Sequence, residues 1–282
     1  MDVLEAYPSA EKLSKDLRKV LAGLTDHEAR LLVDTYYAMQ DMRIRSFHQA
    51  RAANESGEPH AVFNWLERNN KQLEAQVKSA LDIYTRNHPM GEWMRLTKGV
   101  GPVISAGLLA HIDIQRAPDV SHIYNFAGLN PEKKWGKGEK RPWNAKLKRL
   151  CWLIGESFVK VSSKEDAVYG QAYVKRKAYE TKMNERGAYR ERALEDAKRY
   201  GKGTTAYKFA SEVFLPPGHI HERSKRWAVK MFLSHLHEVW HYQHFGYRPR
   251  QPYVIAYTEH EGYTPPPNTH LFPGFDEAER RV

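Results

Sequence analysis

The sequence predicts an all-α fold with a helical amino-terminal pair, a helix-hairpin-helix core and an irregular, proline-rich tail. Three observations support this. Apolar residues recur at helical spacing over the first 90 positions, a Gly-x-Gly turn is followed at once by Pro102 and an apolar helix, and proline and glycine gather after position 247. The expected segments are a coiled-coil-like domain over 1–90, the core over 91–160, a helical insertion over 161–218, a closing helix over 219–246 and an extended tail over 247–282.

Composition narrows the class of protein. The chain has 282 residues and a mean hydropathy of −0.71, and no apolar run approaches the ~20 residues that a membrane span requires. Its first residues lack the basic segment and apolar core of a signal peptide. The single cysteine, Cys151, excludes an intramolecular disulfide and lies in an apolar run, which predicts a buried thiol. We therefore expect a cytoplasmic protein without membrane contact, compatible with a phage or mobile-element origin.

The formal net charge of +10 is unevenly distributed. Residues 1–90 carry 12 Lys and Arg against 13 Asp and Glu, a net charge of −1. By subtraction from the totals of 44 and 34, residues 91–282 carry 32 against 21, a net charge of +11. Such an asymmetry predicts a polyanionic partner for the later part of the chain, most often nucleic acid.

The first 90 residues read as two long helices. Thr25-Asp-His-Glu28 fits a capping box, and 54–59 is the clearest break between the helices. The second helix, expected from about Val62 to Tyr84, has apolar residues seven, four, four and three positions apart. Two long amphipathic helices predict an antiparallel pair that serves as a scaffold or as the interface of a homodimer.

The turn Gly99-Val-Gly101 is the centre of the predicted core. Pro102 suits the first position of a helix, where the missing N–H costs nothing. Glycine leaves room for a ligand beside the backbone, and a helix amino terminus attracts anions. The alternative is an ordinary glycine turn in a helical core. The residues expected to contact phosphate here are Lys98, Gly99, Gly101 and Ser105.

A basic loop follows a short helix that is expected to end near Gly128. Between positions 131 and 150 there are eight basic residues and two acidic ones, interleaved with two tryptophans. Basic side chains neutralise phosphates, and an indole can stack on an unpaired base. The alternative is a solvated loop anchored to the core by its tryptophans. The expected contacts are Lys133, Lys134, Trp135, Lys137, Lys140, Arg141, Trp143, Lys146 and Arg149.

The remaining chain is expected to form further helices. An apolar helix is predicted over 144–161, and charge-mixed helices over 164–210 break near Gly187 and Gly201-Lys-Gly203. An aromatic-rich helix is predicted from Glu222 to about Phe245. A short strand is expected at 252–257.

These motifs together resemble a known domain. The blocks Gly99-Val-Gly-Pro-Val, His111-Ile-Asp113 and Phe126-Ala-Gly-Leu-Asn-Pro131, then a basic loop and Leu147-Lys-Arg-Leu150, resemble the carboxy-terminal domain of the DEDD insertion-sequence transposases, which use a bridging RNA. The helix from Arg226 to Trp240 resembles the closing helix of that domain. The resemblance covers about a third of the chain and implies a helix-hairpin-helix fold in contact with nucleic acid.

Two departures limit what the resemblance implies. The family's amino-terminal nuclease domain has no counterpart here, and Trp135 stands about where the family places a serine nucleophile. The expected function is therefore that of a transposase-derived DNA-binding or accessory recombination protein, with RNA as the alternative polyanion. No cofactor is expected.

Two enzymatic alternatives remain open from the sequence. Asp119 follows the hairpin at a distance similar to that of the catalytic aspartate of helix-hairpin-helix glycosylases, which would imply chemistry on an extruded base; its other role would be to cap the next helix. The segment His237-Glu-Val-Trp-His241 matches H-E-x-x-H, which would imply a zinc hydrolase with Glu238 as base. His237 and His241 could hold zinc with Glu259 or Glu261 as a third ligand, and the alternative is an incidental or structural metal site.

Overall fold

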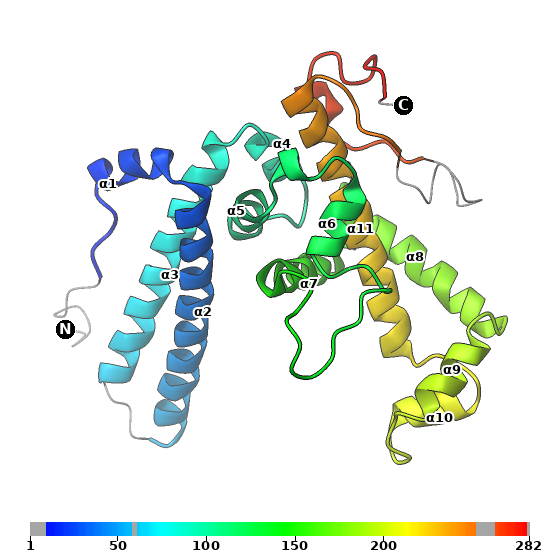
Figure 1. Cartoon of the computed structure of the whole chain (residues 1–282). Coiled ribbons are helices and arrows are strands. Elements are labelled where there is room, and N and C mark those ends of the chain that lie inside the picture. Colours follow the sequence, from blue (N-terminus) through cyan, green and yellow to red (C-terminus); the bar gives the residue numbers. More distant parts are fainter. Residues whose placement is uncertain (1–9, 58–60, 252–262, 281–282) are drawn as a thin grey trace. The chain divides into compact units, whose positions relative to one another are not determined.

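The computed structural model describes residues 10–57, 61–251 and 263–280, and over these residues the fold is all-α, as predicted (Figure 1). Within the described ranges, β-structure is limited to an isolated bridge between Arg248 and Arg280, and no helix has the length and apolar character needed to cross a membrane. The chain divides into two compact units. One comprises Met1–Arg95 with Gly101–Asp113, and the other Leu96–Val100 with Ile114–Val282.

The first unit is built on a long antiparallel helix pair (Figure 1). The capping box at Thr25 and Glu28 is present at the start of the first helix, and the chain breaks between Glu55 and Ala61, as expected. The helices of this unit are α1 (Lys15–Val20), η2 (Leu21–Gly23), α2 (Asp26–Glu55), α3 (Ala61–Asn87), α4 (Gly91–Leu96) and α5 (Pro102–His111).

Polar contacts fix how α2 and α3 pair along their length. The hydroxyl of Tyr84 donates to Asp26 Oδ1 at 2.8 Å, and Asn70 Nδ2 donates to Ser46 Oγ at 2.7 Å in a buried position. Arg43 forms an ion pair with Glu74 between them. Such pairs specify one register, because a shifted register would leave buried polar groups unsatisfied.

The second helix of the hairpin, α5, packs on α2 and α3 rather than within the predicted core. Residues 103 and 105–110 are all buried, so α5 needs cover on almost every side. Arg30 Nη1 donates to the carbonyl of Ala110 at 2.6 Å, and Thr85 Oγ1 donates to the carbonyl of Pro102 at 3.4 Å. The boundary between the units therefore runs through the hairpin turn and not near residue 90, where the sequence placed it.

The second unit is organised around its longest helix, α11, which contacts α6, α7 and α8. This helix begins at Pro217, five positions before the predicted Glu222, because a proline with a fixed φ suits the first helical turn. It ends at Phe245, and the C-cap residue Gly246 has a φ of 78°. The elements of this unit are η3 (Ile114–Arg116), α6 (Val120–Phe126), α7 (Ala145–Lys160), α8 (Val168–Glu185), α9 (Arg190–Ala197), α10 (Thr205–Ser211), α11 (Pro217–Phe245) and η4 (Thr269–Leu271).

Aromatic rings form the centre of the second unit. Phe158, Tyr169 and Phe232 lie with ring centroids 5.1–5.6 Å apart, which brings α7, α8 and α11 together. The helices α7 and α11 also approach each other closely at Gly155. A Cβ at this position would lie only 2.5 Å from Cγ of the buried Lys225. The expected strand at 252–257 lies outside the described residues.

Candidate nucleic-acid interface

The predicted hairpin turn is present, with the expected local geometry. The helix α4 ends at Leu96, the N–H of Val100 donates to the carbonyl of Thr97 at 3.0 Å, and α5 begins at Pro102. Gly101 is the residue before α5 and supplies no side-chain cap. The first backbone amides of α5 are thus without a side-chain cap, as an anion-binding turn requires.

The two glycines of the turn have different structural explanations. Gly99 has a φ of +93°, and a Cβ there would lie 3.0 Å from Phe158 Cδ1, so its conformation and its packing on α7 both require glycine. Gly101 has a φ of −88° that any residue adopts, is exposed and would have nothing within 4 Å of an added Cβ. Neither the backbone conformation nor the packing of the described residues requires glycine at position 101, where the residue is the N-cap of α5.

The other two residues predicted in the turn differ in accessibility. Lys98 is exposed and forms an ion pair with Asp166 at 3.2 Å; such surface pairs contribute little stability and can be exchanged for a phosphate. Ser105 is completely buried and its backbone N–H bonds to the carbonyl of Gly101. The expectation of a phosphate contact at Ser105 is therefore corrected, because this side of α5 faces the helix pair.

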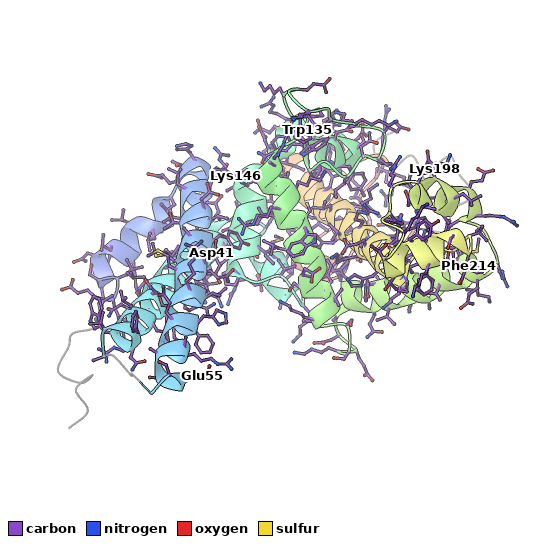
Figure 2. The ribbon with its side chains drawn as sticks, turned by 90° about the horizontal axis from the view of Figure 1, so that it is seen from below. Asp41, Glu55, Trp135, Lys146, Lys198 and Phe214 are labelled. Carbon is purple, nitrogen blue, oxygen red and sulfur yellow. The ribbon has the colours of Figure 1, made fainter. Side chains whose placement is uncertain are left out.

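The basic loop is exposed, as its composition indicates. Trp135 lies on the loop that leads into α7, and Lys146 lies in the first turn of that helix (Figure 2). Asn144 caps α7 by accepting from the N–H of Leu147 at 3.0 Å. The exposed basic residues predicted in this region are Lys133, Lys134, Lys137, Lys140, Arg141, Lys146 and Arg149.

The two tryptophans of the loop have different environments. Trp143 is half-buried, and its ring lies against the backbone of Gly128, where a Cβ would approach within 2.7 Å. This is the anchoring role that was the alternative for the loop. Trp135 is 42% exposed; its Nε1 donates to the carbonyl of Glu139 at 2.7 Å, and the guanidinium of Arg141 lies 4.7 Å from its ring centroid. Trp135 is therefore the better candidate for stacking on a base.

Beside the loop lies a group of like charges, which we call the cation cluster: Arg141, Lys148, Arg226 and Lys230. The ammonium of Lys148 lies 4.0 Å above the ring of Trp143. Burial, and then the charges of Arg141 and Arg226, lower the pKa of Lys148. Burial and Arg226 likewise lower the pKa of Lys230. None of the four forms an ion pair with a carboxylate among the residues that the structure describes. The cluster is therefore an uncompensated positive region.

The turn and the loop contact opposite ends of the same helix. Ser157 Oγ donates to the carbonyl of Gly99 at 2.5 Å near the carboxyl end of α7, whereas the loop enters α7 at Asn144. Thirteen residues at 1.5 Å each separate these two points by about 20 Å. The two predicted contacts are thus separate and do not form a single site.

Asp119 occupies the N-cap position of α6 but makes no capping hydrogen bond with its side chain. It is half-buried, and the ring Nδ1 of the exposed His122 lies 3.2 Å from its backbone carbonyl. Asp119 therefore stands where a capping residue is expected, but its carboxylate does not act as the cap.

The H-E-x-x-H segment faces the interior of the second unit. His237 Nε2 lies 2.7 Å from the carbonyl of Ala117, and His241 Nδ1 lies 3.1 Å from that of Tyr247. Burial lowers the pKa of His237 to about 4. Glu238 accepts hydrogen bonds from Arg248 and Arg280. The segment thus has a structural explanation; Glu259 and Glu261, the expected third zinc ligands, lie outside the described residues.

A different group of residues has metal-ligand chemistry. Ligand atoms of Glu156, His221 and Glu222 lie within 4.8 Å of one another. However, the buried ammonium of Lys225 contacts both carboxylates. Its distance from the carboxylate of Glu222 is 2.6 Å. Burial is the largest single effect and lowers the pKa of Lys225, but the hydrogen bonds that the ammonium donates to the two carboxylates, together with their charges, raise this pKa overall. The protonated lysine offsets one of the two negative charges and contacts both carboxylates, so the group reads as an internal ion-pair network.

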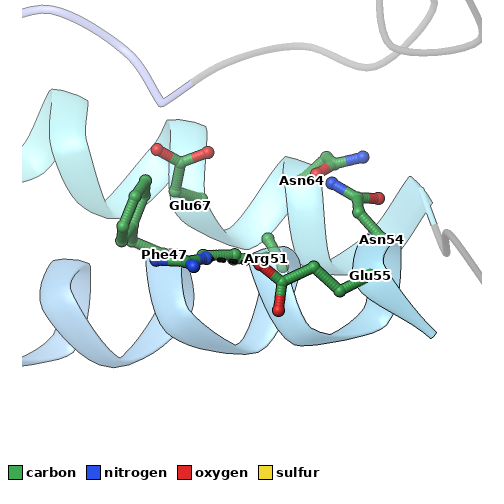
Figure 3. A pocket seen from close by; sticks show the side chains of 7 residues that line it. Phe47, Arg51, Asn54, Glu55, Asn64 and Glu67 are labelled. Atoms are coloured by element: carbon green, nitrogen blue, oxygen red, sulfur yellow. Dashed lines mark hydrogen bonds and ion pairs between the residues drawn. The ribbon is translucent and has the colours of Figure 1, made fainter.

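A groove of about 410 Å³ lies in the first unit, between the carboxyl end of α2 and the amino end of α3 (Figure 3). Phe47 borders it, and Arg51 forms an ion pair with Glu55 at 2.6 Å on its wall. It contains none of the residues predicted to bind nucleic acid.

The sequence analysis missed the part of the cation cluster that lies on α11. Arg226 and Lys230 come within four positions of each other on a helix, and this spacing places both side chains on one face. The predicted closing helix was read for its aromatic residues and its histidines, so the periodicity of its cations went unused.

Comparison of the chain with protein-family models, curated proteins and solved structures finds no match. A functional assignment therefore depends on the chemistry of the residues described above.

Proposed function

We propose that this protein binds DNA through the phosphate backbone, as a transposase-related DNA-binding protein that is accessory to recombination. The observation that carries the proposal is the cation cluster of Arg141, Lys148, Arg226 and Lys230 beside the exposed basic loop. Cations whose charges lower the pKa values of their neighbours repel one another. A polyanion relieves that repulsion while it releases its own counterions. The transposase relationship rests on the sequence motifs.

The turn and the loop offer two backbone contacts of different kinds. The loop supplies the charges of exposed lysine and arginine side chains. The turn at the exposed Gly101 supplies backbone amides at the start of α5. Neither contact reads base edges, so we expect binding that depends on salt and on DNA structure more than on sequence.

The test is a titration of fluorescent duplex DNA with the full chain over a series of salt concentrations. The variant Lys133→Glu/Lys134→Glu/Lys137→Glu should bind about a hundredfold more weakly at low salt and lower the salt slope by about 3, since each neutralised phosphate contributes about one unit. The matched control is Lys12→Glu/Lys71→Glu/Lys78→Glu, which makes the same charge change at exposed positions of the first unit.

Equal losses in both triple variants would show that only net charge matters and would overturn the proposed site. Absence of binding by the unmodified protein at low salt would overturn the function itself. A parallel titration with duplex RNA of the same sequence decides whether DNA is preferred.

A second candidate function is chemistry on an extruded base. The carboxylate of Asp119, which makes no capping hydrogen bond to α6, favours it. Bound DNA can be digested and its nucleosides analysed by mass spectrometry. Loss or modification of one nucleoside that Asp119→Asn abolishes, with DNA binding retained, would support this candidate. Unchanged nucleosides would dismiss it.

A further inference from the structure

The amino-terminal half of α11 presents one basic and aromatic face. Its members recur at positions four, three, one and three apart, which places them along one side of a helix. From first to last they span eleven residues, or about 16 Å. We call this the α11 face, and its residues are His219, Arg223, Arg226, Trp227 and Lys230.

Exposed rings lie beside cations on this face and on the neighbouring helix α8. Trp227 is 38% exposed, and the guanidinium of Arg176 lies 5.4 Å from its ring centroid. The same guanidinium lies 4.8 Å from the ring of Tyr179, which is 45% exposed. Arg223 lies 4.6 Å from the ring of Tyr189. The two exposed rings, Trp227 and Tyr179, therefore share one cation between them.

A buried carboxylate holds two of the cations at this face without cancelling them. Glu180 is almost fully buried and forms ion pairs with both Arg176 and Arg223. One carboxylate thus binds two guanidinium groups, so that a net positive charge remains and both arginines are fixed in orientation before any ligand arrives.

The α11 face is continuous with the cation cluster. Arg226 belongs to both, and its charge acts on Lys148 of α7 and on Lys230 of its own helix. A nucleic-acid strand that binds the basic loop can therefore continue along α11 towards α8 while it stays in contact with positive charge.

We propose that the α11 face binds single-stranded DNA, with unpaired bases stacked on Trp227 and Tyr179 and phosphates held by Arg226 and Lys230. This inference rests on the proposed function, because the loop supplies the adjoining backbone contacts. Phosphates require only cations, and duplex DNA keeps its bases stacked inside. Exposed rings interleaved with cations are the arrangement that recognises an unpaired strand.

The test compares the binding of a 20-nucleotide oligo(dT) with that of a 20-base-pair duplex. Trp227→Ala should weaken oligo(dT) binding by about tenfold, the usual cost of losing one stacked base, and leave duplex binding within about twofold. Arg226→Glu/Lys230→Glu should weaken oligo(dT) binding by about a hundredfold. The matched control, Lys71→Glu/Lys78→Glu, makes an equal charge change at exposed positions of α3 and should have little effect.

Thermal melting separates loss of fold from loss of a contact, and Trp227→Phe retains a ring for stacking. The inference is supported if Trp227→Phe binds oligo(dT) at near-normal affinity while Trp227→Ala does not. It is overturned if Trp227→Ala binds oligo(dT) like the unmodified protein while the triple loop variant does not, a result that would leave the proposed function intact. Equal losses of duplex and oligo(dT) binding in Trp227→Ala would also overturn it.

Discussion

Gly99 and Gly101 belong to one Gly-x-Gly pattern, yet the structure requires glycine only at position 99. The sequence predicted the turn and the start of α5 correctly, because Gly-x-Gly followed by proline is a local signal. It could not separate the two glycines, since the contact of Gly99 with Phe158 joins residues far apart in the chain.

We predict opposite consequences for alanine at these two positions. Gly99→Ala places a Cβ at a φ of +93° and against Phe158, and should lower the free energy of unfolding by about 1–3 kcal/mol. Gly101→Ala should cost less than about 1 kcal/mol but weaken DNA binding several-fold, because the Cβ would stand where the backbone meets the ligand. Urea denaturation and DNA titration of both variants measure the two effects.

Normal DNA binding by Gly101→Ala would show that no ligand approaches this turn closely. In that case the cap position alone explains the residue, since glycine is an acceptable N-cap.

Ser105 illustrates a limit of residue-level prediction. A serine in the first turns of a helix beside an anion-binding loop is a reasonable phosphate ligand, yet here it is fully buried. The cause is the apolar character of α5 on all sides, which draws the whole helix between its neighbours. Local sequence gives the residue type, whereas burial is decided by which helices cover it.

At the scale of elements, α7 sets the distance between the two predicted contacts. Its apolar residues predicted the helix to within one residue at each end, and the structure adds Asn144 as its capping residue. The consequence, that the turn and the loop lie about 20 Å apart, required knowing that Gly99 hydrogen-bonds Ser157. Such long-range pairing leaves no trace in a single sequence.

The helix α11 makes the stability of the second unit dependent on pH. Burial lowers the pKa values of His235 and His237 to about 4. In the unfolded chain both titrate near 6.5, so below that pH the unfolded state binds protons that the native state does not. Stability is therefore complete above about pH 6.5 and declines as the pH falls towards 4, by about 2 kcal/mol for each histidine at pH 5.

Urea denaturation at pH 7 and pH 5 measures this decline. His237→Gln, which cannot protonate, should reduce the difference between the two pH values by about half, whereas His244→Gln, at an exposed position of the same helix, should leave it unchanged. A difference that His237→Gln does not reduce would mean that other groups govern the response.

At the scale of the whole molecule, the sequence correctly predicted an all-α chain. It placed a boundary near residue 90, where the predicted hairpin region and the basic character of the chain both begin. The compact units instead exchange segments at the turn, with Gly101–Asp113 in the first unit and Leu96–Val100 in the second. Charge reports what a surface binds, whereas the division follows the burial of α5.

The first unit leaves apolar side chains exposed along α2. Leu31 is 53% exposed and Met42 is 47% exposed, and with Thr35 and Ala38 they are spaced four, three and four positions apart, the repeat of a coiled-coil seam. Of the thirty residues of α2, the structure buries only Ala29, Val33, Ser46 and Ala50. A pair of helices that buries so little of one member has room for a further helix.

We predict that a second copy of the chain covers this seam, so that the protein is a dimer at micromolar concentration. Leu31→Glu/Met42→Glu should convert it to a monomer, as measured by light scattering coupled to size exclusion, because two carboxylates cannot be buried unpaired in the seam. Val168→Glu/Val174→Glu, at comparably exposed positions of α8, should leave the mass unchanged. A dimer also doubles the number of DNA contacts, so the monomeric variant should lose avidity for long DNA but not for a short duplex that reaches one copy. A monomeric unmodified protein would contradict the prediction, whereas a variant that is monomeric but binds long and short DNA alike would show that the two copies do not share one DNA molecule.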